Sequence, residues 1–536
     1  EDEDDDNGDM DFTSGQSTEG PCSKKCHREE DRWHLKEEKD ARPDPLRFLP
    51  VREPGPTIDP SASWSPLSLF QLFFSDTVLS TIIANTNTNA AKSLEAGMRF
   101  FWKPLTLSDF YIFLSIIVFS GLVKVHVRGD YWRKEWPYNF RFPGDSMRKD
   151  CFESILWSLH LSNPAEDEKN DRKKSTAGYD RLFKIKPLYT QIVNACKAHF
   201  QPYQNISIAE RIVASKACVS MNQYMKDKPK KRGHRIFVLT DSLTAYKWNF
   251  FVYEGKSVHG PGRGLNYTPV MDLMAFPLLG QGYTVFVDNF YSSPALFEEL
   301  SRQNTGACGT IRRNQAGFPK TKQNDLPKNA ERGDMRWIRQ NNLLFVKWMD
   351  TCPVTICSTV HEAFSGQTVQ RKGLWDTENV TVPDPVLAYN RNMAEVNASD
   401  ALTDYHGVHH KTMKWYQTFF CHFIDIAIVN SFLLLKELHK KKNIPTMKKP
   451  LTLKSFREKL AAEMLEFAKV SAPPTPTSTA CMPAYYGDNG TESRRYCKRC
   501  QNAGIRRMKT PVYCTKCQVP LCFTSKRNCF RDWHEK

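Results

Sequence analysis

Neither of the two most apolar runs in this sequence is expected to cross a membrane. A spanning helix needs about 20 consecutive apolar residues. The most apolar run, residues 110–123, falls short of this and is followed directly by Lys124. The second, residues 419–435, is interrupted by a histidine, an aspartate and an asparagine. Both runs are therefore expected to form buried core helices, and no membrane partner is predicted.

No secretory leader is expected at the beginning of this sequence. Eight of the first eleven residues are acidic, whereas a signal peptide begins with positive charge and continues into an apolar stretch. The 16 cysteines are therefore expected to be thiols or metal ligands in a reducing compartment rather than disulfides. No internal repeat is present.

Length and charge narrow the class of protein. The chain has 536 residues, of which 40% are hydrophobic and 12% aromatic, and this excludes a wholly disordered chain. At roughly 100–200 residues per domain, two to four structural units are expected. The formal net charge of +16 favours nucleic acid as the partner.

Two hydrophobic patterns divide the chain. From residue 67 to about 198, and again from 399 to 438 and 453 to 470, the pattern predicts helices with one buried face. Between these regions, short runs rich in β-branched and aromatic residues predict strands that alternate with helix, as in a mixed α/β sheet. These strands are expected at residues 205–208, 234–239, 246–253, 283–287, 335–338, 343–349 and 355–358.

The strongest spacing signal lies at the C-terminal end. Two Cys-x2-Cys pairs, Cys497 with Cys500 and Cys514 with Cys517, are expected to close one tetrahedral zinc site with their four thiolates. A second zinc would need one ligand more than the sequence identifies there, so one or two structural Zn2+ ions are predicted. Buried cysteines without metal are the alternative. The three remaining candidate ligands are Cys522, Cys529 and His534.

The same end carries much of the positive charge. Residues 494–536 contain 12 Lys and Arg against two acidic residues, and a small basic metal module fits contact with DNA phosphates. Two further basic runs, 226–235 and 440–449, are DNA-facing loops, nuclear-import signals or solvated charged faces. The residues expected to contact double-stranded DNA are Lys228, Lys230, Lys231, Arg232, Arg506, Arg507 and Lys509.

One carboxylate is well placed for catalysis. Asp288 ends the apolar strand at 283–287. Nucleic-acid enzymes with an α/β core use such carboxylates to hold two Mg2+ ions, which activate the attacking oxygen and stabilise the leaving one. An aspartate that serves only the turn is the alternative interpretation.

Ordered motifs across most of the chain resemble piggyBac-type transposases and the proteins derived from them. The resemblance implies an RNase H-like catalytic core with an inserted subdomain, flanked by a split helical domain that binds DNA and dimerises. It also implies cut-and-paste chemistry at TTAA sites through an aspartate metal triad, and a zinc module that reads DNA. The matching stretches are 179–186, 223–230, 238–255, 287–293, 309–320, 389–390, 411–420 and the cysteine-rich end.

The resemblance suggests eight segments. They are a disordered tail (1–65), a first helical segment (66–204), a first core segment (205–312), an insertion (313–384), a second core segment (385–402), a second helical segment (403–470), a linker (471–493) and the zinc module (494–536).

The chain departs from the family at two of the implied metal-binding positions. Ala209 stands where the first aspartate is expected and Asn397 where the third is expected, while Asp288 and Asp400 remain. Successive strand residues point to opposite faces, so Glu210 is not expected to replace the lost ligand. We therefore expect DNA cleavage to be lost or reduced by orders of magnitude.

Three interpretations follow. The first is a nuclear, homodimeric, transposase-derived protein that binds DNA and is impaired as an enzyme. The second is an active transposase at TTAA sites, which alone requires Mg2+. The third is a chromatin or protein-interaction module that acts through its zinc end.

Overall fold

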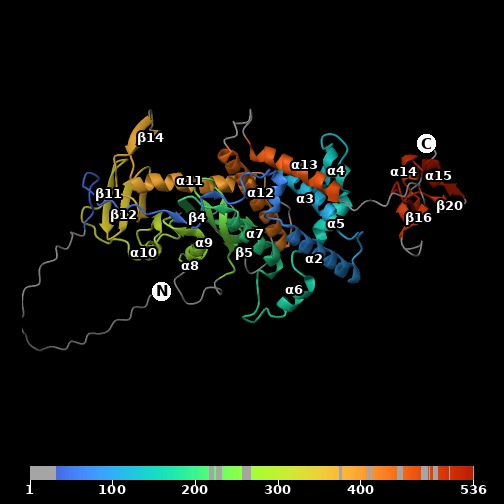
Figure 1. Ribbon diagram of the computed structural model, residues 1–536, viewed down its shortest axis with the longest axis horizontal. Helices are drawn as coiled ribbons and strands as arrows, with labels where there is room; N and C mark the ends of the chain where they lie inside the picture. Colours follow the sequence, from blue (N-terminus) through green and yellow to red (C-terminus); the bar gives the residue numbers. More distant parts are fainter. Residues whose placement is uncertain are drawn as a thin grey trace, which may run out of the picture. The chain divides into compact units, whose positions relative to one another are not determined.

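The chain forms two compact units (Figure 1). Unit 1 comprises residues up to Ile58, 196–212 and 220–401, and unit 2 comprises 59–195, 213–219 and 402–536. The structure, a computed structural model, describes residues 32–215, 222–224, 232–255, 267–372, 377–405, 407–408, 412, 414–442, 451–471, 481, 483–486, 493–505, 508–524 and 526–534.

Unit 1 is built on a nine-stranded mixed sheet. The strand order is β11-β12-β13-β10-β9-β4-β6-β5, and β7 also pairs with β6. At its centre β4, β9 and β10 run parallel, whereas β10, β13, β12 and β11 are antiparallel neighbours. The strands are β4 (Asn205–Ala214), β5 (Asn222–Tyr224), β6 (Arg232–Asp241), β7 (Lys247–Val252), β9 (Thr284–Val287), β10 (Gly306–Thr310), β11 (Met335–Gln340), β12 (Leu343–Met349) and β13 (Pro353–Ser358).

The predicted strands are present in this sheet. Those expected inside the segment 313–384 extend the same sheet as those of the core, because β13 pairs directly with β10. A separate hairpin in that segment joins β14 (Thr368–Lys372) to β15 (Thr377–Thr381).

Helices cover both faces of the sheet (Figure 1). On one face α11 (Asp384–Tyr405) contributes Val386 to a buried cluster with Phe286 and Trp348. On the other face lie α8 (Thr268–Met274) and α10 (Pro294–Arg302), and α10 buries its apolar side against the sheet.

Residues 32–65 are not disordered, contrary to the expectation from their charge and proline content. Trp33 is fully buried, and its Nε1 donates to the carbonyl of Thr321 at 3.0 Å. His34 forms a backbone bridge with Trp337 on the edge strand β11. Unsatisfied backbone groups at sheet edges can fix a segment that has little apolar content of its own. Two short strands continue the attachment: β1 (Leu49–Pro50) pairs with β8 (Gly280–Gln281), and β2 (Gly55–Pro56) pairs with β3 (Phe200–Gln201).

Unit 2 contains a helical domain assembled from two distant stretches of the sequence. Ser108 and Ser115 on α3 donate to the carbonyls of Ala468 and Ala461 on α13, each at 2.7 Å. The helix expected from residue 399 to 438 is instead two helices, because α11 ends at Tyr405 and α12 begins at Trp415. The helices are α1 (Pro66–Gln71), α2 (Asp76–Glu95), α3 (Leu107–Leu122), α4 (Arg141–Ser146), α5 (Lys149–Ser158), α6 (Pro164–Asp171), α7 (Lys186–Ala198), α12 (Trp415–Lys441) and α13 (Leu453–Ser471).

One described helix is long and apolar enough to cross a membrane by length and composition. This is α12, but 89% of its most apolar window is buried inside the protein. The second apolar run of the sequence is therefore a core helix, as predicted.

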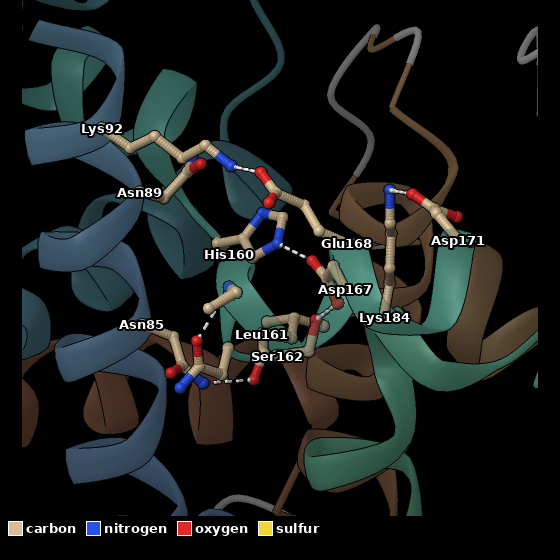
Figure 2. A network of polar contacts seen from close by, with 12 residues as sticks. Asn85, Asn89, Lys92, His160, Leu161, Ser162, Asp167, Glu168, Asp171 and Lys184 are labelled. Atoms are coloured by element: carbon tan, nitrogen blue, oxygen red, sulfur yellow. Dashed lines mark hydrogen bonds and ion pairs between the residues drawn. The ribbon is translucent and has the colours of Figure 1, made fainter. Parts of the chain in front are cut away.

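A buried polar network holds the turn between α5 and α6 (Figure 2). Asn85 and Asn89 on α2 donate to backbone carbonyls of this turn. His160 Nε2 lies 2.5 Å from one oxygen of Asp167, and the Ser162 hydroxyl donates to the other at 2.6 Å. Because the carboxylate lies between the serine and the histidine, the histidine cannot act as a base on the serine. The network is structural.

Candidate functional site

Ala209 and Asp288, two positions singled out in the sequence, directly follow the last residues at which β4 and β9 pair. β4 and β9 pair in parallel, with Ile208 opposite Val287. Extended one residue beyond the end of β9, the same register would set Ala209 opposite Asp288. Neighbouring strands lie about 4.8 Å apart, so a carboxylate at position 209 would be close to that of Asp288.

The turn that follows β9 fixes Asp288. One carboxylate oxygen accepts a hydrogen bond from the backbone N–H of Phe290 at 2.9 Å. The backbone carbonyl of Asp288 accepts from the Ser292 hydroxyl at 3.0 Å. A Cβ at Gly309 would lie 2.3 Å from that hydroxyl oxygen, so only glycine lets β10 approach the turn. Asp288 thus has the role of a turn residue, and an aspartate in such a turn still has its second oxygen for a ligand.

Helix α11 lies against the face of β4 that carries Ala209. Ser207, two residues earlier and hence on the same face, donates to the carbonyl of Asn392 on α11 at 3.2 Å. The same helix continues through Asn397 and Asp400, which are three residues apart and so share a side of the helix. The side chains of Asn397 and Asp400 lie outside the described residues.

Glu210 is bound to an arginine on a neighbouring strand. Its Oε2 accepts from Arg235 Nη2 at 2.6 Å, and the two side chains are only 5% and 7% exposed. The Arg235 guanidinium also lies over the rings of Phe237 and Phe290, at 4.9 and 4.8 Å from their centroids. Because Glu210 neutralises this buried cation, it is not available to replace the carboxylate missing at Ala209.

We expect Glu210→Gln to destabilise unit 1 without changing metal binding. The substitution leaves the Arg235 charge buried without a carboxylate, which costs about 3–5 kcal/mol. The loss would appear as a lower urea midpoint. Glu166→Gln, in an exposed pair with Lys169, is the matched control and should leave the midpoint unchanged. A Glu210→Gln variant with normal stability and weakened Mg2+ binding would instead identify Glu210 as a ligand.

The cysteine-rich end contains two groups of four metal-ligand side chains. The grouping expected from the spacing is wrong, because the two Cys-x2-Cys pairs do not share one site. Cys497 and Cys500 meet Cys522 and Cys529. The other group contains Cys514, Cys517, His534 and Cys481.

Cys481 is an eighth candidate ligand, which the sequence alone did not identify. The residue lies in the segment 471–493 expected to be a linker, where nothing in the local spacing pairs it with another ligand. The structure joins this segment to the cysteine-rich end, since β16 (Pro483–Tyr485) pairs with β19 (Val512–Cys514). A lone cysteine shortly before an apolar Pro-Ala-Tyr-Tyr run is the signal that could have identified it.

The distances within both groups suit a tetrahedral ion. The ligand atoms of each group lie within 4.8 Å of one another. The Sγ atoms of Cys481 and Cys517 are 3.8 Å apart, and those of Cys500 and Cys529 are 3.6 Å apart. With Zn–S bonds of about 2.3 Å, the edge of a tetrahedral thiolate site is about 3.8 Å. Four ligands at this spacing form a closed site.

Neighbouring groups prepare these ligands to bind a cation. Burial opposes ionisation of Cys514, yet the backbone N–H groups of Cys517 and Lys516 lower its pKa to about 7. Burial and the sulfurs of Cys481 and Cys514 raise the pKa of Cys517 to about 11. His534 Nδ1 lies 2.7 Å from the Phe530 carbonyl and donates to it, so Nε2, 3.3 Å from Cys517 Sγ, has the free lone pair. All four ligands can ionise or coordinate together only around a cation.

Lys509 is the one residue among the seven expected DNA contacts whose side chain is described. It is exposed, and its Nζ lies 5.3 Å from the ring centroid of Tyr496. Arg232 begins β6, although its side chain lies outside the described residues. The remaining five also lie outside them: Lys228, Lys230, Lys231, Arg506 and Arg507.

Comparison with known proteins identifies the class and then the family. A family model described as Transposase IS4 matches residues 65–432, which makes the chain a member of a transposase family of the DDE type. The chain belongs to the piggyBac-type branch of these transposases. The prediction made from the ordered motifs is confirmed.

Human relatives and a solved structure agree with this assignment. The chain is 25% identical over 414 residues to human PiggyBac transposable element-derived protein 3, covering 75% of this chain and 65% of the relative. It is 24% identical over 408 residues to human PiggyBac transposable element-derived protein 5, covering 74% and 75%. Its fold matches a piggyBac transposase in a synaptic complex with hairpin DNA, with a TM-score of 0.69 and 20% identity over 88% of this chain and 98% of that one.

Proposed function

We propose that the chain is a nuclear DNA-binding protein derived from a piggyBac transposase, with its cut-and-paste activity impaired or lost. In this proposal the nine-stranded sheet is an RNase H-like core, and the helices of unit 2 bind DNA and support a homodimer. The two cysteine-rich groups hold two structural Zn2+ ions. In this proposal the chain has kept DNA binding and has lost DNA cleavage.

The parallel register of β4 and β9, which when extended by one residue sets Ala209 opposite Asp288, is the observation that supports this proposal. A two-metal site needs several carboxylates, because each neutralises part of the charge of the dications and fixes their positions. The methyl group at 209 supplies neither charge nor ligand oxygen. Asn397 offers at most a neutral oxygen, and Glu210 is already paired with Arg235. Asp288 and Asp400 alone would hold Mg2+ weakly.

The cysteine-rich end supports DNA binding because it is small, closed by metal ligands and strongly basic. Its described cations include Lys498, Lys509 and Lys516, all exposed. Cations on a rigid scaffold release counterions when they contact phosphates, so the binding affinity should fall steeply with salt.

Replacing Lys509 by Gln should weaken duplex binding similarly for all sequences. A phosphate contact contributes about one unit to the slope of log K against log salt, so the slope should become shallower by about one. Fluorescence anisotropy over a salt series measures both quantities. Lys328→Gln, at an exposed lysine in unit 1, is the matched control and should leave duplex binding unchanged.

Two outcomes would favour the other interpretations. Binding of a peptide but not of duplex DNA by the cysteine-rich end would identify an interaction module for chromatin or protein. Efficient Mg2+-dependent nicking of a matching transposon end by the unaltered chain would identify an active transposase.

A further inference from the structure

One indole group stands out on the surface of the helical domain in unit 2. Trp136 is 89% exposed, more than any other large hydrophobic residue among those the structure describes. It lies in a turn of residues 133–138, hereafter the Trp136 turn. An indole left almost wholly in water forgoes the burial that normally stabilises such a side chain. Tryptophan is enriched in binding interfaces and among the residues that contribute most to binding energy.

The residues around the Trp136 turn anchor it to the helical domain. Tyr131 is buried and donates its hydroxyl to the carbonyl of Val123 at 2.5 Å. Trp132 Nε1 donates to the carbonyl of Met147 at 2.7 Å. Phe119 on α3 packs edge-on against the rings of Tyr131, Phe140 and Phe142, at 5.1–5.9 Å between centroids.

The turn itself is closed by a backbone hydrogen bond. The N–H of Tyr138 donates to the carbonyl of Glu135 at 3.0 Å, which encloses Trp136 between them. The Arg133 guanidinium lies 5.1 Å from the ring centroid of Tyr138 and braces the base of the turn. Because the backbone beside Trp136 is already fixed, a partner that binds the indole has little chain entropy to remove.

The charge around the turn is positive. Residues 124–153 contain seven Lys and Arg against five acidic residues, of which Asp150 and Glu153 pair with Arg148 and Lys149. Lys134 and Arg141 are exposed on either side of Trp136, and Glu135 is exposed but within 3.9 Å of Arg133. A nucleic acid satisfies both features, since its phosphates match the cations and its bases match the aromatic ring. An apolar protein surface or a lipid interior would match the indole but would leave the cations without counter-charges.

We propose that the Trp136 turn is a DNA contact in which the indole stacks on a base that is not paired in a duplex, while the flanking cations lie along the phosphates. This inference rests on the proposed DNA-binding function and specifies the form of DNA that this surface of the helical domain recognises. In a regular duplex both faces of each base are already stacked. A single convex indole therefore reaches a base face only at a hairpin loop, a flap or an opened step.

Binding of two DNAs by the full chain tests the proposal. One is a blunt duplex, and the other is the same duplex closed by an unpaired TTAA loop. Trp136→Ala should weaken binding to the looped DNA about tenfold, the usual effect of removing one base-stacking ring, and leave binding to the blunt duplex unchanged. Trp136→Phe, which keeps a ring, should recover most of the loss. Quenching of 2-aminopurine placed in the loop should disappear with Trp136→Ala.

Trp157→Ala is the matched control, because Trp157 is a second exposed tryptophan in the same helical domain, 65% exposed on α5. It should bind both DNAs as the unaltered chain does. If Trp136→Ala keeps full affinity for the looped DNA, the inference is overturned although DNA binding stands. If it instead lowers the molecular mass of the protein in solution, the turn is a protein contact and the inference is likewise overturned. If the unaltered chain binds neither DNA, the proposed function itself fails.

Discussion

Restoring aspartate at positions 209 and 397 is expected to raise Mg2+-dependent nicking of a transposon end by about a hundredfold or more. The register of β4 and β9, extended by one residue, sets Ala209 opposite Asp288, so an aspartate there would add a carboxylate to the residues that would hold a metal ion. Metal ions lower the barrier of such displacements by several kcal/mol, and each 1.4 kcal/mol is tenfold in rate. Isothermal titration with Mg2+ would follow binding independently of cleavage.

An asparagine at position 209 tests whether the charge of an aspartate, and not only its size, is needed. Ala209→Asn combined with the native Asn397 should restore neither Mg2+ affinity nor nicking, because an amide oxygen lacks the charge needed to hold a dication. A double aspartate variant that binds Mg2+ but does not cut would place the defect elsewhere in the chain. Nicking by the unaltered chain at the rate of the double variant would contradict the proposed loss of activity.

Substitution of Cys481 by Ser is expected to remove one of two zinc ions and to unfold much of the cysteine-rich end. The structure groups Cys481 with Cys514, Cys517 and His534. The apparent free energy of binding of a structural zinc is about 10–16 kcal/mol at pH 7, which is folding free energy for a module this small. Native mass spectrometry should show the zinc content fall from two to one. Because the thiols must ionise to bind, acidification should release the metal as well.

Cys352→Ser is the matched control, since Cys352 is an exposed free cysteine outside both groups. It should keep both ions. The experiment also separates the structural grouping from the one expected by spacing alone. If the two Cys-x2-Cys pairs shared one ion, Cys481 would have no role and its substitution would leave the zinc content unchanged.

The strands and helices could be predicted because their hydrophobic periods reflect which faces are buried. The strand that ends at Asp288 and the buried character of α12 both followed from short apolar patterns. The fixed position of residues 32–65 did not, because Trp33 and His34 are held by a sheet edge that lies about 300 residues further along the chain. Composition reports how much apolar surface a segment has, not which distant backbone groups it can satisfy.

Some features of the candidate sites could be predicted from the sequence, and others required the structure. The replacement of a family aspartate by Ala209 stays a prediction from the sequence, and the ligand types of the cysteine-rich end are visible in their spacing. The salt bridge from Glu210 to Arg235 is not visible there, because the two residues are 25 positions apart and meet only through the sheet. The exposed position of Trp136 also depends on a contact between separate segments, since Trp132 Nε1 donates a hydrogen bond to the carbonyl of Met147.

By itself, the sequence determined the family, the alternating regions of helix and strand and seven of the eight candidate metal ligands, and it predicted the loss of two family carboxylates. These are properties of residue identity and of local spacing. Only the tertiary structure decided which cysteines lie together, that Cys481 completes the second group and that the strand carrying Ala209 pairs with the strand before Asp288. The physical reason is that coordination and strand register depend on distances of a few ångströms between segments far apart in the chain, and these distances are set by the packing of the whole fold.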